Sequence, residues 1–386
     1  MQTEQNEAQG AADALRGEMK EIDAEIAKLF RRRMEIVGKS AAISGAGAAT
    51  FGPAYERDTL ARATEIAGSG MERDARALFT TMFGIASARR RAIANGEAPI
   101  AESVRRTAAA GVPFPDRAFV ACPGADGSYA QQAVSQMFRM PTILFMRDFE
   151  SVFEMVEKGM CPYGILPIEN SSAGSVAQVY DLMVKHRFHI VRSTRVKVSH
   201  VLLGRRGATL DGIREIASHP HALAQCGTFL KSHRDTRTVP AANTAVAAKE
   251  LAENGPDWRA VVASRACADL YGLEILAEGI SDTPFNYTRF ICISRKMEIT
   301  PDADKFSIML TLPHRPGSLN AIISKFAAAG VNLTKLESRP IPGMDFEFRF
   351  TFEFESSPTN PDVLALISEL SQDPEIEGFT FLGSYA

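Results

Sequence analysis

The spacing of hydrophobic residues changes twice along this chain of 386 residues, which divides it into three segments with different expected folds. Residues 11–97 show only the helical period. Residues 117–295 alternate short apolar runs with helical stretches, which predicts an α/β domain with a largely parallel sheet. Residues 304–386 predict the order βαββαβ, the ferredoxin-like α+β layout. We therefore expect a multidomain protein, in agreement with a domain size of roughly 150 residues.

The N-terminal segment predicts an all-α unit that is too thin to fold around its own core. Its first helix carries one narrow apolar stripe with steps of four and three residues: Leu15, Met19, Ile22, Ile26 and Leu29. A loop over 44–54 and helices over 55–67 and 71–94 follow. Such a stripe suits a bundle or dimer seam, so we expect a homodimer that shares the core. Residues 98–116 hold three prolines and little periodicity, which predicts a linker.

Charge and cysteine usage exclude several classes of protein. Lys and Arg number 43 against 46 Asp and Glu, a net charge of −3, which argues against a general nucleic-acid binder. The five cysteines are scattered with no CxxC pair, which favours a reducing cytoplasm over disulfides or a zinc site. The N-terminus lacks a signal-peptide pattern, and no run of 18 apolar residues predicts a membrane span.

Four polar blocks lie beside predicted strands of the middle segment. Three follow a strand, where ligands bind in α/β sheets, and the fourth stands at the start of one. They are the glycine-rich turn 124–129, the dense polar run 167–176, the two-histidine run 218–226 and the run 286–290. Each block alone has a plain alternative. The first can be an ordinary tight turn, the second a helix cap at Ser171 or Ser172, the third a loop that caps the next helix, and the fourth a surface Arg beside a β-prone Thr.

Taken together and in this order, the four blocks resemble the prephenate dehydratase family, with its GSY-like turn, PIENSxxGSV, SHPxALxQC and NxTRF runs. The match covers 117–295. It implies a two-lobed fold like type II periplasmic binding proteins, with one lobe at 117–193 plus 276–295 and the other at 194–275. It also implies decarboxylation and dehydration of prephenate to phenylpyruvate, a step of phenylalanine biosynthesis. Aromatisation drives this reaction, so no cofactor or metal is expected.

The resemblance carries roles onto particular residues. Thr288 is expected to assist the leaving hydroxyl, by hydrogen bonding or by relay from Glu169 or a water. Arg289 is expected to bind one substrate carboxylate, and backbone N–H groups at Ser128 and Ser171, together with Asn170, the other. The predicted catalytic residues are Ser128, Tyr129, Glu169, Asn170, Ser171, Gln225, Thr288, Arg289 and Phe290, with Tyr129 and Phe290 as apolar walls.

The C-terminal segment resembles the ACT domain, a small-molecule sensor, through the runs 314–319 and 337–340 (ESRP). The implied effector is L-phenylalanine. Its carboxylate would meet the helix N-terminus near 316–319. The predicted effector-binding residues are Pro316, Gly317, Ser318, Leu319, Asn332, Leu333, Thr334, Glu337 and Ser338. A plain dimerisation domain is the alternative.

The N-terminal helices resemble the all-helical chorismate mutase family through Arg16, Arg33, Arg57 and Asp58. Ser44 stands where the family has a lysine, and Arg90 where it has a glutamine. Loss of such an electrostatic donor commonly costs about 10²–10³ in rate, although Arg90 offers a substitute cation. Mutase activity on chorismate therefore stays open, and a degenerate domain kept for dimerisation or communication is the other reading.

Two further alternatives remain for the whole chain. It can be a non-catalytic binding protein that senses amino acids, or a dehydratase that takes arogenate. Dimerising modules at both ends allow a homodimer or a homotetramer.

Overall fold

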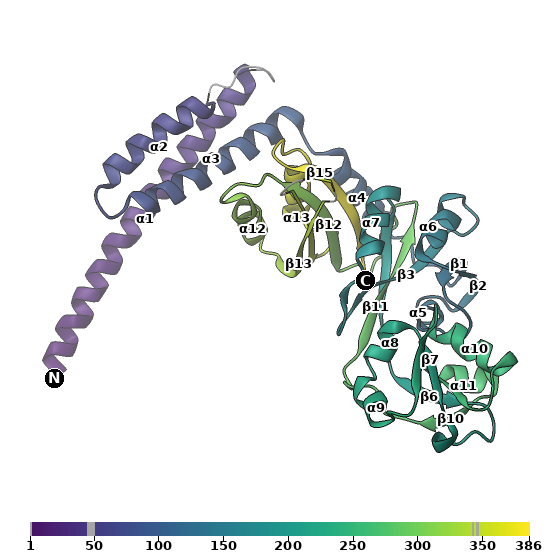
Figure 1. Ribbon diagram of the computed structural model, residues 1–386. Helices are drawn as coiled ribbons and strands as arrows, with labels where there is room; N and C mark the ends of the chain where they lie inside the picture. The colour runs from purple at the N-terminus through teal and green to yellow at the C-terminus, as the bar shows by residue number, and fades with distance from the viewer. Residues whose placement is uncertain (1, 45–50, 342, 345–346) are drawn as a thin grey trace.

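The computed structural model describes residues 2–44, 51–341, 343–344 and 347–386, and it divides into a helical arm, a two-lobed α/β unit and a C-terminal α+β unit (Figure 1). Within these ranges, no helix combines the length and apolarity that crossing a membrane requires.

The helical arm consists of α1 (Gln2–Ser44), α2 (Pro53–Ala67) and α3 (Glu72–Asn95). The first half of α1 projects away from the rest of the molecule (Figure 1), and its five stripe residues are 46 to 67% exposed. The only core cluster found among the arm's described residues is Met34, Val37 and Ala86. The predicted helices over 55–67 and 71–94 are α2 and α3, whereas most of the predicted loop, at 45–50, lies outside the described residues.

The predicted linker over 98–116 is wrong, because most of it forms α4 (Pro99–Ala109). Pro99 begins this helix at a position that suits proline. Ala101 and Val104 are fully buried in the core of the C-terminal unit, against α13 (Pro361–Ser371). The buried residues of α4 are Ala101 and Val104. Two such residues form too short an apolar pattern to predict a helix in a segment that holds three prolines.

The first lobe of the α/β unit is built on a six-stranded sheet, with the order β2-β1-β3-β11-β5 and the short β4 paired to β3. Strands β1 to β3 are parallel, and β11 runs antiparallel between β3 and β5, so the sheet is mixed. Its elements are β1 (Arg117–Pro123), α5 (Tyr129–Met137), β2 (Met140–Met146), α6 (Phe149–Glu157), β3 (Tyr163–Asn170), β4 (Gly174–Ser175), α7 (Ala177–His186), β5 (His189–Lys197) and β11 (Tyr287–Ser294).

The second lobe is a five-stranded mixed sheet with the order β10-β6-β9-β7-β8. Its elements are β6 (His200–Gly204), the 3₁₀ turn Leu210–Gly212, β7 (Glu215–Ser218), α8 (Pro220–Ala224), α9 (Gly227–Ser232), β8 (Arg237–Pro240), α10 (Thr244–Asn254), β9 (Arg259–Ser264), α11 (Ala266–Tyr271) and β10 (Glu274–Ala277). The two lobes confirm the predicted two-lobed α/β arrangement. The first lobe runs four residues past its predicted end at 193, because β5 continues to Lys197.

The C-terminal unit has the predicted order βαββαβ, with the antiparallel sheet order β13-β14-β12-β15. Its elements are β12 (Lys305–Leu312), α12 (Ser318–Ala328), β13 (Asn332–Pro340), β14 (Phe348–Glu355), α13 and β15 (Glu377–Tyr385). The alternating phenylalanines of β14 place Phe352 and Phe354 in the core. Residues 345 and 346 of the predicted third strand lie outside the described residues.

The C-terminal unit is packed tightly on the first lobe. Met309, Leu382 and Tyr385 belong to the same buried cluster as the residues of β3, α6 and α7. The backbone N–H of Ser193 on β5 donates to the carbonyl of Ala386 at 2.8 Å. A Cβ at Gly383 would collide with the backbone carbonyl of Ile190 on β5, so this close approach requires glycine. The two units therefore share a core.

Candidate active site

The strand pair β3 and β11 organises the candidate site, because its two faces carry different chemistry. Asn170 lies opposite Thr288 in the register, and Glu169 lies opposite Arg289. Successive residues of a strand point to opposite faces. Asn170 and Thr288 therefore share the face toward the second lobe, while Glu169 and Arg289 share the other.

The side-chain amide of Asn170 is oriented by the backbone and in turn binds Thr288. Its Oδ1 accepts the backbone N–H groups of Ser172 and Ala173, each at 3.0 Å, which fixes which amide atom is the oxygen. Its Nδ2 then donates to Thr288 Oγ1 at 2.9 Å. Because the Thr288 oxygen accepts this bond, its own hydrogen is free to donate to a ligand.

The same network continues into the second lobe. Asn170 Nδ2 also donates to Asn286 Oδ1 at 2.8 Å, and Asn286 Nδ2 donates to Gln225 Oε1 at 2.9 Å. Gln225 Nε2 donates to Ser172 Oγ at 3.0 Å, which ties the two lobes together. The network therefore joins three places: Gln225 at the end of α8, Asn286 in the connection between the lobes, and Ser172 in the polar turn after β3.

His200 completes this network, and its tautomer follows from the fixed amides. Its Nε2 lies 3.0 Å from Gln225 Oε1, which only accepts, so Nε2 carries the hydrogen. Burial lowers the pKa of His200, so the ring is neutral and Nδ1 is an acceptor. Nδ1 lies 3.3 Å from the Tyr129 hydroxyl, whose one hydrogen is donated to the Ser199 carbonyl at 2.8 Å.

Two predicted anion-binding groups are wrong, because their N–H groups are already used. Ser128 is the N-cap of α5, where its Oγ accepts from Gln131 N at 3.2 Å and its own N–H donates to the Ala125 carbonyl. The Ser171 N–H donates to the Tyr287 carbonyl at 2.9 Å. Both serines hold the backbone in place instead of offering donors to a carboxylate.

The glycine-rich turn likewise joins the lobes. The Gly127 carbonyl accepts from Ser264 Oγ at 2.7 Å, and the Asp126 carbonyl from the Tyr271 hydroxyl at 2.8 Å. A Cβ at Gly127 would lie 2.8 Å from Cys267 Sγ, so glycine is required for this contact. This turn therefore packs on the second lobe at α11, and its glycine serves that contact.

The structure places Arg289, Glu169 and Phe290 away from the cleft in which they were predicted to act. Arg289 is 11% exposed and pairs with Glu353 Oε1 at 2.7 Å and Glu169 Oε2 at 3.2 Å, on the face away from Thr288. Glu169 therefore cannot relay a proton to Thr288, and Arg289 does not reach the cleft. Phe290 is buried in the core beneath α5, so it is no cleft wall.

Sequence analysis named the runs that contain Asn286 and Ser172 but gave these two residues no role in the cleft, and it did not single out His200. His200 and Asn286 are almost fully buried, at 2% and 0% exposure. A buried polar side chain needs a partner, so the position of His200 directly before the apolar run 201–203 was an available signal.

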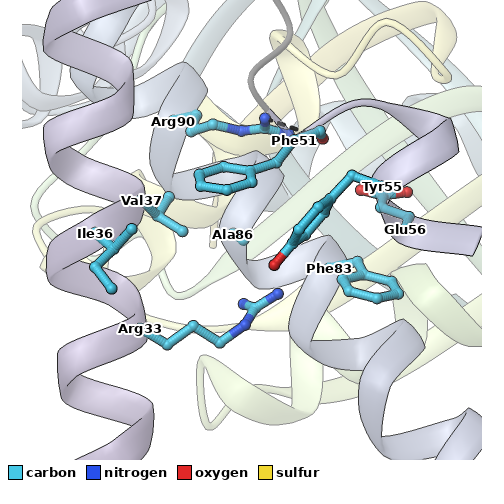
Figure 2. Close-up of a pocket in the computed structure, with 9 residues that line it drawn as sticks. All are labelled: Arg33, Ile36, Val37, Phe51, Tyr55, Glu56, Phe83, Ala86 and Arg90. Atoms are coloured by element: carbon cyan, nitrogen blue, oxygen red, sulfur yellow. Dashed lines mark hydrogen bonds between the residues drawn. The ribbon is translucent and has the colours of Figure 1, made fainter. Parts of the chain in front are cut away.

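The arm holds a separate pocket of about 100 Å³ between its helices (Figure 2). Arg33 donates to the Met82 carbonyl at 3.2 Å, and Arg90 donates to the Phe51 carbonyl at 3.3 Å and to Ser87 Oγ at 2.9 Å. The rings of Phe51 and Tyr55, with centroids 4.9 Å apart, lie between the two guanidinium groups (Figure 2). Two aromatic rings of the chain therefore line the pocket between its two arginines.

Only two of the predicted mutase-like residues meet there. Arg16 pairs with Asp13 at 2.9 Å on the exposed part of α1. Arg57 and Asp58 are exposed on α2 and do not line the pocket. Within one chain, Arg33 and Arg90 are thus brought together without Arg16, Arg57 or Asp58.

The C-terminal unit has a pocket of about 120 Å³ beside the start of α12. The residues that line it are Leu312, Pro313, His314, Arg315, Ser318, Leu319, Phe348 and Phe350. The Ser318 hydroxyl is buried and has no hydrogen-bond partner among the described residues. Of the predicted effector residues, Ser318 and Leu319 line this pocket, and Pro316 and Gly317 form the turn that enters α12.

The other predicted effector residues lie on β13, apart from this pocket. Glu337 is turned toward the first lobe, where the Ser175 hydroxyl donates to it at 2.5 Å. Asn332, Thr334 and Ser338 are exposed, and Leu333 packs against the core of the C-terminal unit.

Comparisons with known proteins agree with this geometry. The family model described as prephenate dehydratase matches residues 120–298. A protein of Arabidopsis thaliana named arogenate dehydratase/prephenate dehydratase 2, chloroplastic, is 36% identical over 253 residues, which cover 62% of this chain and 66% of the relative. This chain spans 57 to 66% of the length of four relatives with which it shares 36 to 37% identity.

Two solved structures cover the same part of the chain. The prephenate dehydratase of Arthrobacter aurescens, solved in complex with L-Phe, is 31% identical, with a TM-score of 0.63 over 69% of this chain and 90% of that chain. A protein described as GqqA, a novel type of quorum quenching acylase, is also 31% identical, with a TM-score of 0.61 over 69% of this chain and 97% of that one.

Proposed function

The chain belongs to the prephenate dehydratase family, and we propose that it is an enzyme that converts prephenate to phenylpyruvate, carbon dioxide and water. The observation that carries this proposal is the Thr288 hydroxyl. Asn170 holds its oxygen at 2.9 Å and leaves its hydrogen free on the face between the lobes.

The reaction needs help mainly at the leaving hydroxyl. The bond to the ring carboxylate breaks and gives CO₂, its electron pair enters the ring, and the ring C–O bond breaks. The departing oxygen takes up one proton and leaves as water. A hydrogen bond from Thr288 to this oxygen supports its departure, an effect of about 10²–10⁴ in rate for a positioned donor. Because a threonine hydroxyl has a high pKa, a water is the proton source in this account.

Substrate entry requires the lobes to separate. The Gln225 to Ser172 bond and the glycine-rich turn hold the cleft shut in this arrangement. The chain crosses between the lobes at 198–199 and 278–286, which supports a hinge there. We propose that the substrate's polar groups replace the Gln225 to Ser172 bond on binding.

The test is product formation by the full chain with prephenate and arogenate offered separately. We expect phenylpyruvate and CO₂ in equal amounts from prephenate. Turnover of arogenate alone would move the assignment to the other activity in the relatives' names. No product from either substrate would contradict a dehydratase.

An acylase activity, named for one similar structure, has less support in this chain. A hydroxyl nucleophile needs a base within hydrogen-bond distance. Among the described residues, none of the cleft hydroxyls of Ser171, Ser172 and Thr288 is bonded to a histidine, and His200 bonds Gln225 and Tyr129 instead.

We also propose that the C-terminal unit is an ACT domain that binds phenylalanine at the start of α12. The unpaired Ser318 hydroxyl, the cation of Arg315 and the ring of Phe348 beside one pocket support a ligand with a carboxylate and an aromatic ring. The relative from Arthrobacter aurescens was solved with L-Phe. Dimerisation alone is the competing role.

For the arm we propose dimerisation in a mutase-like fold that does not turn over chorismate. The exposed stripe of α1 supports pairing with a second copy, and the rings of Phe51 and Tyr55 between Arg33 and Arg90 argue against a bound dicarboxylate. Chorismate consumption by the full chain would contradict this proposal, as would a monomer in sedimentation experiments. A cytoplasmic location stays a prediction, supported by the five buried free cysteines.

A further inference from the structure

The back face of the β3–β11 strand pair is joined to the C-terminal unit by buried charges. Arg289 reaches Glu353 on β14 at 2.7 Å, and these side chains are only 11% and 9% exposed. Arg289 also lies 3.2 Å from Glu169. The cation directly after Thr288 is therefore held from two sides.

A second cation completes the cluster from β13. Lys335 Nζ lies 3.3 Å from Glu169 Oε2 and 2.8 Å from Ser175 Oγ, and its side chain is 12% exposed. It also lies 3.3 Å from Glu337. Strands β13 and β14 of the C-terminal unit thus each contact Glu169 or its neighbour across the register, Arg289.

Docking of the two units does not require this charge cluster. The shared core around Met309, Leu382 and Tyr385 and the close approach of Gly383 to β5 already join them. Buried ion pairs cost desolvation and are weak evidence for stability. Arg289 Nε is moreover buried without a hydrogen-bond partner in the part of the chain that the structure describes, so the cluster is not fully satisfied there.

The cluster instead fixes the residues next to the reacting hydroxyl. Consecutive Cα atoms are about 3.8 Å apart and linked by a planar peptide, so a shift of Arg289 also shifts Thr288. The same holds for Glu169 and Asn170. The ion pairs on one face of β3 and β11 therefore restrain both strands at the positions where the opposite face carries the Asn170 to Thr288 bond.

We propose that Arg289 and Glu169 are positioning residues, which hold the Asn170–Thr288 pair in its productive geometry by anchoring β3 and β11 to Glu353 and Lys335 of the C-terminal unit. This inference rests on the proposed dehydratase activity. In this account Arg289 does not bind the substrate but positions Thr288, the residue directly before it.

The experiment compares kcat and KM for prephenate in the full chain and in Arg289→Gln, Glu353→Gln and Glu169→Gln. Misplacement of a reacting group by about 1 Å can cost about 10²-fold, so we expect kcat to fall about 10- to 100-fold. We expect KM to change less than about threefold, because none of these side chains touches the substrate. The Arg289→Gln/Glu353→Gln pair should lose little more than either single variant.

Asp181→Asn is the matched control. Asp181 lies in the same interface, 3.6 Å from Arg339, and among the described residues it makes no ion pair with the strand pair, so kcat should be unchanged. A variant that leaves one buried charge unpaired can fail to fold. The double variant Arg289→Met/Glu353→Met removes both charges together, and it should keep its melting temperature but still lose kcat.

The possible results distinguish a failure of the positioning role from a failure of the proposed dehydratase activity. Absence of product from the unmodified chain would refute the dehydratase itself. If the unmodified chain is active, unchanged kcat in the folded Arg289 and Glu353 variants would overturn the positioning role. So would a tenfold or larger rise in KM at constant kcat in Arg289→Gln, which would show that this arginine binds substrate.

Discussion

At the scale of the residue, the orientation of one amide determines the chemistry of the cleft. Two backbone N–H groups fix Asn170 Oδ1, so every later donor and acceptor as far as His200 follows. Asn170, Gln225 and Thr288 were predicted from the resemblance of their runs to the prephenate dehydratase family. Their partner Asn286 lies in one of these runs but received no role, and His200 was not singled out, because a buried polar residue reveals its need for a partner and not the partner's identity.

The neutral state of His200 makes stability depend on pH. Burial lowers its pKa below the ordinary 6.5, so the unfolded chain binds more protons as the pH falls below that value. This contribution to stability is complete above pH 6.5 and is lost on acidification. We expect the melting temperature to drop between pH 7 and pH 5.

The variant His200→Gln should reduce this drop, because it removes one titrating group. Part of the drop should remain, since burial also lowers the pKa of His189 and His219. An equal drop in the variant and the unmodified chain, measured by thermal unfolding, would refute this role for His200.

At the scale of the element, the alternation of a strand gives its two faces but not what covers each face. The sequence placed Thr288 and Arg289 side by side and suggested a common ligand. Only the packing of β14 against β11 shows that Arg289 pairs with Glu353 of the C-terminal unit. The helix α4 was missed for a related reason, since Ala101 and Val104 become core residues only through α13, more than 250 residues later.

The placement of α4 gives a stability prediction. Val104→Ala removes two buried methyl groups and should lower the free energy of unfolding by about 2 kcal/mol. Val112→Ala is the matched control, because Val112 lies just past α4 and is 63% exposed, so its cost should stay within about 0.5 kcal/mol. Denaturant unfolding measures both values, and equal costs would contradict the packing of α4.

At the scale of the whole molecule, the change in hydrophobic period predicted the three units and the βαββαβ order. Periodicity reports on each element by itself, so it did not show that the first lobe and the C-terminal unit share a core. That shared core leaves the second lobe as the part that the hinge can move, and it brings a proposed sensor next to the catalytic strands.

The proposed sensor site can be tested by binding. Ser318→Ala removes the unpaired hydroxyl from the pocket at α12, and one lost hydrogen bond should weaken phenylalanine binding about fivefold. The control Ser338→Ala changes an exposed hydroxyl on β13 and should have no effect. Calorimetric titration measures both, and a larger loss in Ser338→Ala would place the effector on β13.

The most direct test of the account replaces the hydroxyl at position 288 in the full chain and measures phenylpyruvate formation from prephenate. Thr288→Val keeps the shape without the hydroxyl and should lower kcat about 10²–10⁴-fold, whereas Thr288→Ser keeps the hydroxyl and should retain most of the activity. Full activity in Thr288→Val would contradict the assignment of this hydroxyl to the leaving group.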